Sequence, residues 1–467
     1  MSSVSNSAES PPLTPLPSIL HTAGMIVENR IIVIGAGASG LMAAGRAAEM
    51  GADVLLLEKM ERPGLKILVS GNGRCNLSNS RDMDSFIERF GPEGRFLYSP
   101  FSRFFRDDLL AFLKRFGIEC KTEPNGKIYP VTDNARDIVR VFQRYLTDGG
   151  VTVKYGQKVT GITTENGRVT GVKTETGDVP AAAVILAAGG SSHPETGSAG
   201  EGCALAETLG HTIVGLRPGL VPLVVTDTDR AKLMQGASLK DVRVTAFQCP
   251  SCDIDTSLVP PLDTGRGLAG KKPKPPVIES RTGNVIITHF GFSGPAILEM
   301  SRAIVDALCR GTVSLTIDLH PDKDAVALRA DLQQSFDTRS RRTFKNILRD
   351  YLQPRFIDAF IRLTGISPDK LGNQITAEER ERLVSLMKSF RFDVSSPFSM
   401  ATAMVTAGGI SLKEIDPRTM SSKLVPGLFC CGEVLDLDAG TGGYNLQAAF
   451  STGYVAGESA VSFIAGR

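Results

Sequence analysis

The chain has 467 residues, with 52 basic against 50 acidic side chains, 42% hydrophobic residues and 48 glycines. This length predicts two to four domains and a core that needs no disulfides or metals. The near-neutral net charge argues against electrostatic binding of nucleic acid by the chain as a whole. The eight cysteines are scattered along the chain, unlike those of a disulfide-rich secreted scaffold. The composition excludes a fibre, a coiled coil and a disordered chain, and favours a reduced, cytoplasmic protein.

The N-terminal segment is expected to lie outside the fold. Residues 1–24 are rich in Ser and Pro and lack the basic and apolar segments of a secretory signal. No apolar run in the chain approaches the roughly 18–20 residues that cross a bilayer, so no membrane partner is expected. We therefore predict a disordered leader over residues 1–24.

The first folded segment is predicted to be a βαβ unit. Residues 31–34 form a continuous apolar run, as expected of a parallel strand that is covered on both faces. A glycine turn at 35–40 and an alanine-rich helix follow, and a second buried strand spans 53–57.

Further elements follow before the texture of the sequence changes. Amphipathic helices are predicted at 107–116 and 135–149, and a buried strand at 184–187. The segments 151–155, 159–164 and 168–175 are interpreted as a small antiparallel sheet, in which Asn166-Gly167 forms a hairpin turn.

From about Leu216 the sequence predicts an insert. Strand-like segments at 221–226, 242–247, 284–288 and 312–318 are separated by long connections, and the Lys- and Pro-rich segment 260–276 is predicted to be a mobile surface loop. Residues 325–386 are mostly helical in pattern, and 427–431 is one more buried strand. We predict an α/β nucleotide-binding domain (25–210 and 396–467) that is interrupted by a β-rich part (211–324) and a helical part (325–395).

The glycine turn has the context of a dinucleotide-binding fingerprint. Gly35-x-Gly37-x-x-Gly40 follows a buried strand, opens a helix and precedes Glu58 by 18 positions. Gly35 makes the turn, Gly37 lets the backbone approach a pyrophosphate at the helix N-terminus, and Gly40 permits close packing. Glu58 can accept hydrogen bonds from ribose hydroxyls.

Other glycine-containing blocks point to a flavin rather than to a nicotinamide site. They are KILVSGNGRCN at 66–76, AAGG at 187–190, CGEVLD at 431–436, GTGGYNLQ at 440–447 and THFGFSGP at 288–295. Over about 31–457, in this order, the chain resembles the BaiN/RdsA-type NAD(P)/FAD-dependent oxidoreductases, also called aminoacetone-oxidase-like flavoproteins. The resemblance implies a glutathione-reductase-type FAD-binding Rossmann domain that is interrupted by an insert with a β-barrel-like part and a helical part.

The resemblance also implies a non-covalent FAD, NAD(P)H as electron donor and a set of binding residues. Glu58 would hold the adenosine ribose, Val159 would touch the adenine through its backbone, and Glu433 would reach the ribityl chain. Asn445 and Leu446 would present backbone amides to the flavin pyrimidine edge, where a helix N-terminus suits the negative charge of reduced flavin. The complete set comprises Gly35, Gly37, Ala38, Ser39, Gly40, Glu58, Lys59, Lys66, Ser70, Gly71, Asn72, Gly73, Arg74, Asn76, Val159, Ala188, Gly189, Gly432, Glu433, Asp436, Gly442, Gly443, Asn445 and Leu446.

Two absences narrow the chemistry. The sequence has no second strand–GxGxxG–helix unit for a separate NAD(P)H domain, and Cys75 has no neighbouring cysteine for a dithiol relay. Residues 197–202 loosely resemble a stretch of fumarate reductase flavoproteins, which reduce an activated C=C bond.

Two residues are candidates for the catalytic acid. Cys75 lies in a predicted flavin loop and is either a proton donor or a packed thiol. His289 is either an acid or substrate anchor, or a histidine that is bonded inside the insert. The lone CxxC at 249–252 lacks two further zinc ligands, so no metal is predicted, and Cys430-Cys431 is expected only to pack.

The helical part is locally basic. Residues 329–362 contain eight Arg or Lys against four Asp, a balance of +4, which is either a solvated face or a guide for RNA phosphates. The predicted function is hydride transfer that reduces a C=C bond in a small molecule. The alternatives are reduction of uracil in ribosomal RNA to dihydrouracil, an aminoketone oxidase and a non-catalytic flavin-binding protein. No obligate protein partner is predicted.

Overall fold

A parallel five-stranded sheet organises the two ends of the chain in the computed structural model, which describes residues 29–254 and 276–466. The strand order is β19-β10-β1-β2-β6, and every neighbouring pair is parallel. Their bounds are β1 Arg30–Ile34, β2 Asp53–Leu57, β6 Thr152–Lys154, β10 Ala183–Leu186 and β19 Leu428–Cys430. Strand β19 comes after the insert in sequence and pairs with β10. The sheet is therefore complete only when the segments before and after the insert come together.

Helices α2 (Ala38–Glu49) and α15 (Tyr444–Ala465) are in close backbone contact beside this sheet. A Cβ at Gly453 would lie 2.3 Å from the Ser39 carbonyl oxygen, and one at Gly457 would lie 2.5 Å from that of Ala43. Helix α7 (Ala135–Asp148) also packs on α2, where the Tyr145 ring occupies the place of a Cβ at Gly45.

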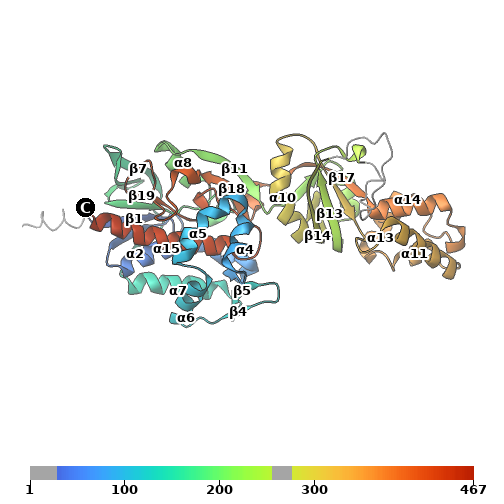
Figure 1. The fold of residues 1–467 in the computed structure, drawn as a ribbon, viewed down its shortest axis with the longest axis horizontal. Helices are drawn as coiled ribbons and strands as arrows, with labels where there is room; N and C mark the ends of the chain where they lie inside the picture. Colours follow the sequence, from blue (N-terminus) through green and yellow to red (C-terminus); the bar gives the residue numbers. More distant parts are fainter. Residues whose placement is uncertain (1–28, 255–275, 467) are drawn as a thin grey trace, which may run out of the picture.

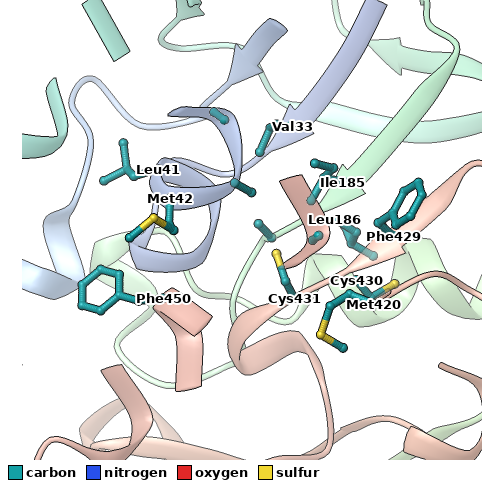
Figure 2. Close-up of a cluster of buried hydrophobic side chains, with 14 of the residues drawn as sticks. Val33, Leu41, Met42, Ile185, Leu186, Met420, Phe429, Cys430, Cys431 and Phe450 are labelled. Carbon is teal, nitrogen blue, oxygen red and sulfur yellow. The ribbon is translucent and has the colours of Figure 1, made fainter. Parts of the chain in front are cut away.

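The core of this part lies between the sheet and these helices. Figure 2 shows Val33, Ile185 and Phe429 from three strands together with Leu41 and Phe450 from the two helices, and all are at most 2% exposed. Cys430 and Cys431 belong to the same cluster and are fully buried, as expected of packing residues. The predicted βαβ unit and Rossmann-type fold are confirmed.

Smaller elements surround the sheet. Helices α3 (Leu65–Val69), α4 (Met83–Ile87), α5 (Tyr98–Arg103) and α6 (Arg106–Arg115) accompany a three-stranded sheet of β3 (Ser78–Asn79), β5 (Lys127–Pro130) and β4 (Cys120–Thr122). A second small sheet contains β7 (Val159–Glu165), β8 (Arg168–Thr174) and β9 (Gly177–Pro180). Asn166 and Gly167 have φ of 51° and 77°, as a tight hairpin turn requires. The prediction was wrong for 151–155, because β6 pairs in parallel with β2 instead.

The insert contains a closed six-stranded barrel in the order β12-β15-β14-β13-β16-β17. Its strands are β12 Leu223–Val225, β13 Ser238–Phe247, β14 Val277–Ile287, β15 Gly291–Ser293, β16 Val313–Asp318 and β17 Phe390–Pro397. Helix α9 (Thr228–Leu233) follows β12, and helix α10 (Pro295–Leu308) lies where the insert meets the nucleotide-binding part (Figure 1). Two connectors, β11 (Ile213–Gly219) and β18 (Val405–Ile410), pair with each other between the parts.

Helices α11 (Ala325–Thr338), α12 (Phe344–Leu348), α13 (Pro354–Thr364) and α14 (Ala377–Lys388) come between barrel strands β16 and β17. They extend from the end of the barrel that faces away from the five-stranded sheet (Figure 1). The division of the chain at 210, 324 and 395 stays a prediction, and β17 begins within the segment assigned to the helical part. The predicted leader and nearly all of the predicted loop 260–276 lie outside the described residues. Within the described ranges, no helix is long and apolar enough to span a bilayer.

Candidate active site

A cavity of about 590 Å³ runs along the carboxyl ends of β1, β2 and β10. Its walls come from the turn after β1, the end of β2, the loop after α3, the segment after β10 and the start of α15. The carboxyl edge is where open parallel sheets bind ligands, because the loops and helix N-termini converge there.

The glycine turn after β1 gives each glycine a different role. Gly35 has φ of 99°, and a Cβ there would lie 2.6 Å from the Ala187 carbonyl oxygen. A Cβ at Gly40 would lie 1.9 Å from the Gly35 oxygen, so that position needs glycine for packing. Gly37 has nothing within 4 Å of its Cβ position and lines the cavity. It caps α2 without a side-chain hydrogen bond, which leaves first-turn amides for an anion.

Glu58 stands at the end of β2 with 9% exposure and lines the cavity. Its Oε2 accepts from the Ala36 amide at 2.6 Å and its Oε1 from the Met60 amide at 2.9 Å. A carboxylate has about four acceptor positions, so two remain for ribose hydroxyls. The carboxylate therefore ties the strand end to the glycine turn and still faces the ligand space.

A polar network connects Lys66 with Glu433 across the cavity. The Lys66 ammonium donates to Glu433 Oε2 at 2.5 Å and to Ser192 Oγ at 2.7 Å. The Thr406 amide donates to Glu433 Oε1 at 2.9 Å, and Thr406 Oγ1 accepts from the Ser191 and Ser192 amides. The network connects segments that are far apart in sequence: α3, the segment after β10, β18 and the segment after β19.

The loop 70–76 has an unusual backbone. Gly71, Asn72, Gly73 and Cys75 all have positive φ, between 57° and 82°. Arg74 belongs to the same loop, and its guanidinium lies 3.9 Å from the centre of the Tyr129 ring and pairs with Glu123 and Asp133. Non-glycine residues with positive φ are held by their surroundings and are common at functional sites.

The N-terminus of α15 forms the opposite wall. Gly442 and Gly443 have φ of 138° and 91°, and a Cβ at Gly443 would lie 2.3 Å from the Ser78 carbonyl oxygen. The Asn445 side chain bonds the backbone of Ala439 in both directions, at 2.9 and 2.8 Å. Asn445 and Leu446 lie in the first turn of α15, where backbone amides have no partner within the helix, so these two amides can face a ligand.

The far end of the cavity, beside Val159, carries paired charges. Glu201, at the start of α8 (Glu201–Thr208), forms ion pairs with Lys59 and, at 3.0 Å, with Lys158. These pairs hold the pKa of Glu201 below its usual value despite its partial burial.

Most residues of the predicted binding set line this one cavity. They are Gly35, Gly37, Ala38, Ser39, Glu58, Lys59, Lys66, Ser70, Gly71, Asn72, Arg74, Asn76, Val159, Ala188, Gly189, Glu433, Gly442, Gly443, Asn445 and Leu446. Gly40, Gly73, Gly432 and Asp436 are not among the lining residues. A Cβ at Gly432 would meet the Ser39 hydroxyl at 2.3 Å, so this glycine serves packing.

Neither of the two candidate catalytic acids, Cys75 and His289, is among the residues that line the cavity. Cys75 is fully buried in the core, and burial raises the pKa of its thiol to about 12. This burial favours the packed thiol among the two alternatives for Cys75. His289 is exposed on the connection between β14 and β15, where its ring contacts Phe290 edge-on.

Sequence reasoning missed several cavity residues, of which His193 is the most informative. His193 lines the cavity and has a φ of 55°. This value is unusual because the proline that follows favours an extended conformation at His193. Its Nδ1 lies 2.8 Å from Glu195 Oε1. The His-Pro dipeptide after AAGG was the available signal. Other missed wall residues are Arg62, Lys127, Tyr129, Leu220, Met404 and Thr441.

These residues fit an FAD. The open Cβ position at Gly37 and the uncapped start of α2 suit a pyrophosphate, and Glu58 suits the ribose. The first turn of α15 lies on the same cavity and suits the pyrimidine edge of the flavin. Glu433 and Lys66 line the same cavity.

Comparison with known proteins identifies the family of this chain. The family model described as HI0933-like protein Rossmann domain matches residues 29–459. A Clostridium scindens protein named 3-dehydro-bile acid delta(4,6)-reductase is 31% identical over 437 residues, covering 92% of this chain and 99% of that protein. An Escherichia coli protein named ribosomal RNA dihydrouridine synthase is 28% identical over 444 residues, covering 92% and 98%.

Among solved structures, 3-ketosteroid-delta4-(5alpha)-dehydrogenase from Rhodococcus jostii overlays with a TM-score of 0.47 and 15% identity, covering 93% of this chain and 97% of that chain. The family match, which spans nearly all of the described residues, and the reductase that is 31% identical carry the assignment. The chain belongs to the HI0933-like Rossmann family and is an FAD-dependent oxidoreductase.

Proposed function

We propose that this protein reduces a C=C bond conjugated with a carbonyl group in a small organic molecule, using FAD and NAD(P)H. The observation that carries the proposal is that two helix N-termini, those of α2 and α15, line one cavity. One positive helix end suits the pyrophosphate, and the other suits the negative charge of a reduced flavin. Bound FAD supplies hydride transfer at its N5 atom.

The chain's own residues bind and orient the cofactor in this proposal. Glu58 holds the ribose, Glu433 and Lys66 hold the ribityl chain, and the amides of Asn445 and Leu446 stabilise the pyrimidine edge. Because the sequence carries one strand–GxGxxG–helix unit, we propose that NAD(P)H and the acceptor use the same cavity in turn. All eight cysteines are free, which supports a reducing, cytoplasmic location.

A relative named as a bile acid reductase supports a small conjugated acceptor. Met404, with 46% exposure, and Val69, with 52%, provide apolar surface at the cavity wall for such a molecule. Ribosomal RNA is the alternative substrate, because two relatives are named ribosomal RNA dihydrouridine synthases.

The proposal is tested first by the cofactor and its donor. Purified protein is expected to be yellow, and acid precipitation is expected to release FAD rather than FMN, because Glu58 and the glycine turn recognise the adenosine half. Anaerobic addition of NADPH or NADH is expected to bleach the flavin. Protein that stays colourless after reconstitution with FAD contradicts the proposal.

A further inference from the structure

Helix α10 of the insert contacts the loop that leads into α15. The Glu299 carboxylate, with 14% side-chain exposure, accepts from the Thr441 amide at 2.7 Å and from the Thr441 hydroxyl at 2.6 Å, both through Oε1. Its Oε2 accepts from Arg89 at 2.9 Å, and Arg281 lies 3.6 Å away. One carboxylate of the insert therefore holds a cavity-wall residue and two arginines.

The same loop is fitted around this carboxylate. A Cβ at Gly440 would lie 2.5 Å from Glu299 Oε2, so the glycine makes room for it. One turn further along α10, Arg302 pairs with Asp438 at 3.0 Å. The segment 438–441 is thus attached to α10 at both ends, and its middle residue Ala439 is bonded to the Asn445 side chain.

We propose that Glu299 is a positioning residue for the flavin end of the site. It fixes Gly440 and Thr441, and through them it sets the first turn of α15 against the pyrimidine edge of the cofactor. The insert thereby forms part of the cofactor environment. This inference rests on the proposed function, since it needs the flavin at that end of the cavity.

Three variants separate the effect of the Glu299 charge from its role as an anchor for Thr441. Glu299→Gln keeps an acceptor oxygen for Thr441 and removes one negative charge, so FAD affinity should stay within about threefold, while the midpoint potential of the bound flavin shifts in the positive direction. Glu299→Ala removes the anchor and should weaken FAD binding at least about tenfold and speed hydrogen exchange at the Thr441 amide of the apoprotein. Asp306→Asn is the control, because Asp306 lies on α10 and pairs with Arg217 at 2.7 Å. It should change none of these quantities.

A double variant tests the fit at Gly440. Gly440→Ala alone should weaken FAD binding because its methyl group meets the Glu299 carboxylate. In the double variant with Glu299→Ala, Gly440→Ala should weaken FAD binding little further, since the Glu299 carboxylate that the methyl group would meet is absent. Unchanged FAD affinity, flavin potential and Thr441 exchange in Glu299→Ala would overturn the inference, as would an Asp306→Asn variant that shifts the potential equally. Wild-type protein that binds no FAD would instead overturn the proposed function, and this inference with it.

Discussion

Glu58 combines two tasks at one position. Its carboxylate accepts the amides of Ala36 and Met60 and also lines the cavity, so the geometry of the turn and the proposed recognition of the ribose depend on the same two oxygens. Because the two backbone amides hold the carboxylate in place, it is already oriented before a ligand binds.

Replacing Glu58 by alanine should weaken FAD binding. We expect Glu58→Ala to lose about 1–3 kcal/mol of binding free energy, or roughly 10- to 100-fold in Kd, while the fold is retained. The measurement is FAD content after gel filtration at low protein concentration. Asp53→Ala, which removes the carboxylate at the start of β2 that pairs with Arg30 of β1, is the control and should retain FAD. If the Glu58→Ala protein retains all of its FAD, the adenosine ribose does not bind at Glu58.

Cys75 shows how a motif position can mislead. Its loop forms the cavity wall, yet the chain reverses with φ of 62° at Cys75 and directs the thiol into the core. The raised pKa, about 12, results first from burial and keeps the thiol protonated at every pH that an assay uses.

We therefore expect Cys75→Ala to leave catalysis nearly unchanged. Reduction by NAD(P)H and turnover should stay within about threefold of the wild type, with the same pH profile below pH 9, because no proton passes through this group. Stability should fall by about 1–2 kcal/mol through lost packing. A loss of 100-fold or more in turnover at unchanged FAD content would restore Cys75 as the acid.

The elements near the cavity differ in how far sequence could predict them. The glycine spacing, the buried strands and the Asn166-Gly167 turn are local signals, and the structure confirms them. Three features depend on contacts between distant segments: β6 joining the parallel sheet, the thiol direction at Cys75, and the bond between Glu299 and Thr441. No local pattern encodes these contacts: sequence reasoning assigned β6 to the wrong sheet, left the role of Cys75 open and did not anticipate the bond between Glu299 and Thr441.

The turn between β1 and α2 allows the packing and binding roles of glycine to be separated. Gly37→Ala should leave the unfolding free energy of the apoprotein nearly unchanged, because its Cβ enters open space, and should weaken FAD binding at least about tenfold. Gly40→Ala should cost about 3 kcal/mol or more of stability, because its Cβ meets a backbone oxygen. Urea unfolding and FAD titration of both variants measure the two effects. Equal effects of both substitutions on stability would contradict the assignment.

At the scale of the whole molecule, the helical part lies at the end opposite the five-stranded sheet (Figure 1). Much of its basic charge is compensated there: Arg329 pairs with Glu381, Arg339 with Asp350, and Lys345 with Asp358. Arg341 and Arg342 are exposed and remain the best candidates for phosphate contacts.

These observations predict little binding to ribosomal RNA. Wild-type protein and the Arg341→Glu/Arg342→Glu variant should both stay at background across a salt series, and both should be reduced by NAD(P)H at the same rate. Arg329→Ala, which removes an already paired charge, is the control. Wild-type binding that falls steeply with salt, with a slope of about 0.7–0.9 per phosphate contact, and that the double variant abolishes would favour RNA as the substrate.

The reductase proposal is tested most directly by what reoxidises the reduced flavin. Wild-type holoprotein is reduced anaerobically and mixed with a steroid enone, with the corresponding saturated ketone, or with oxygen. We predict rapid reoxidation by the enone, with a product that has gained two hydrogens at the former C=C bond, and no reaction with the saturated ketone. Reduced protein that ignores conjugated acceptors and is reoxidised readily by oxygen would contradict the reductase and indicate an oxidase.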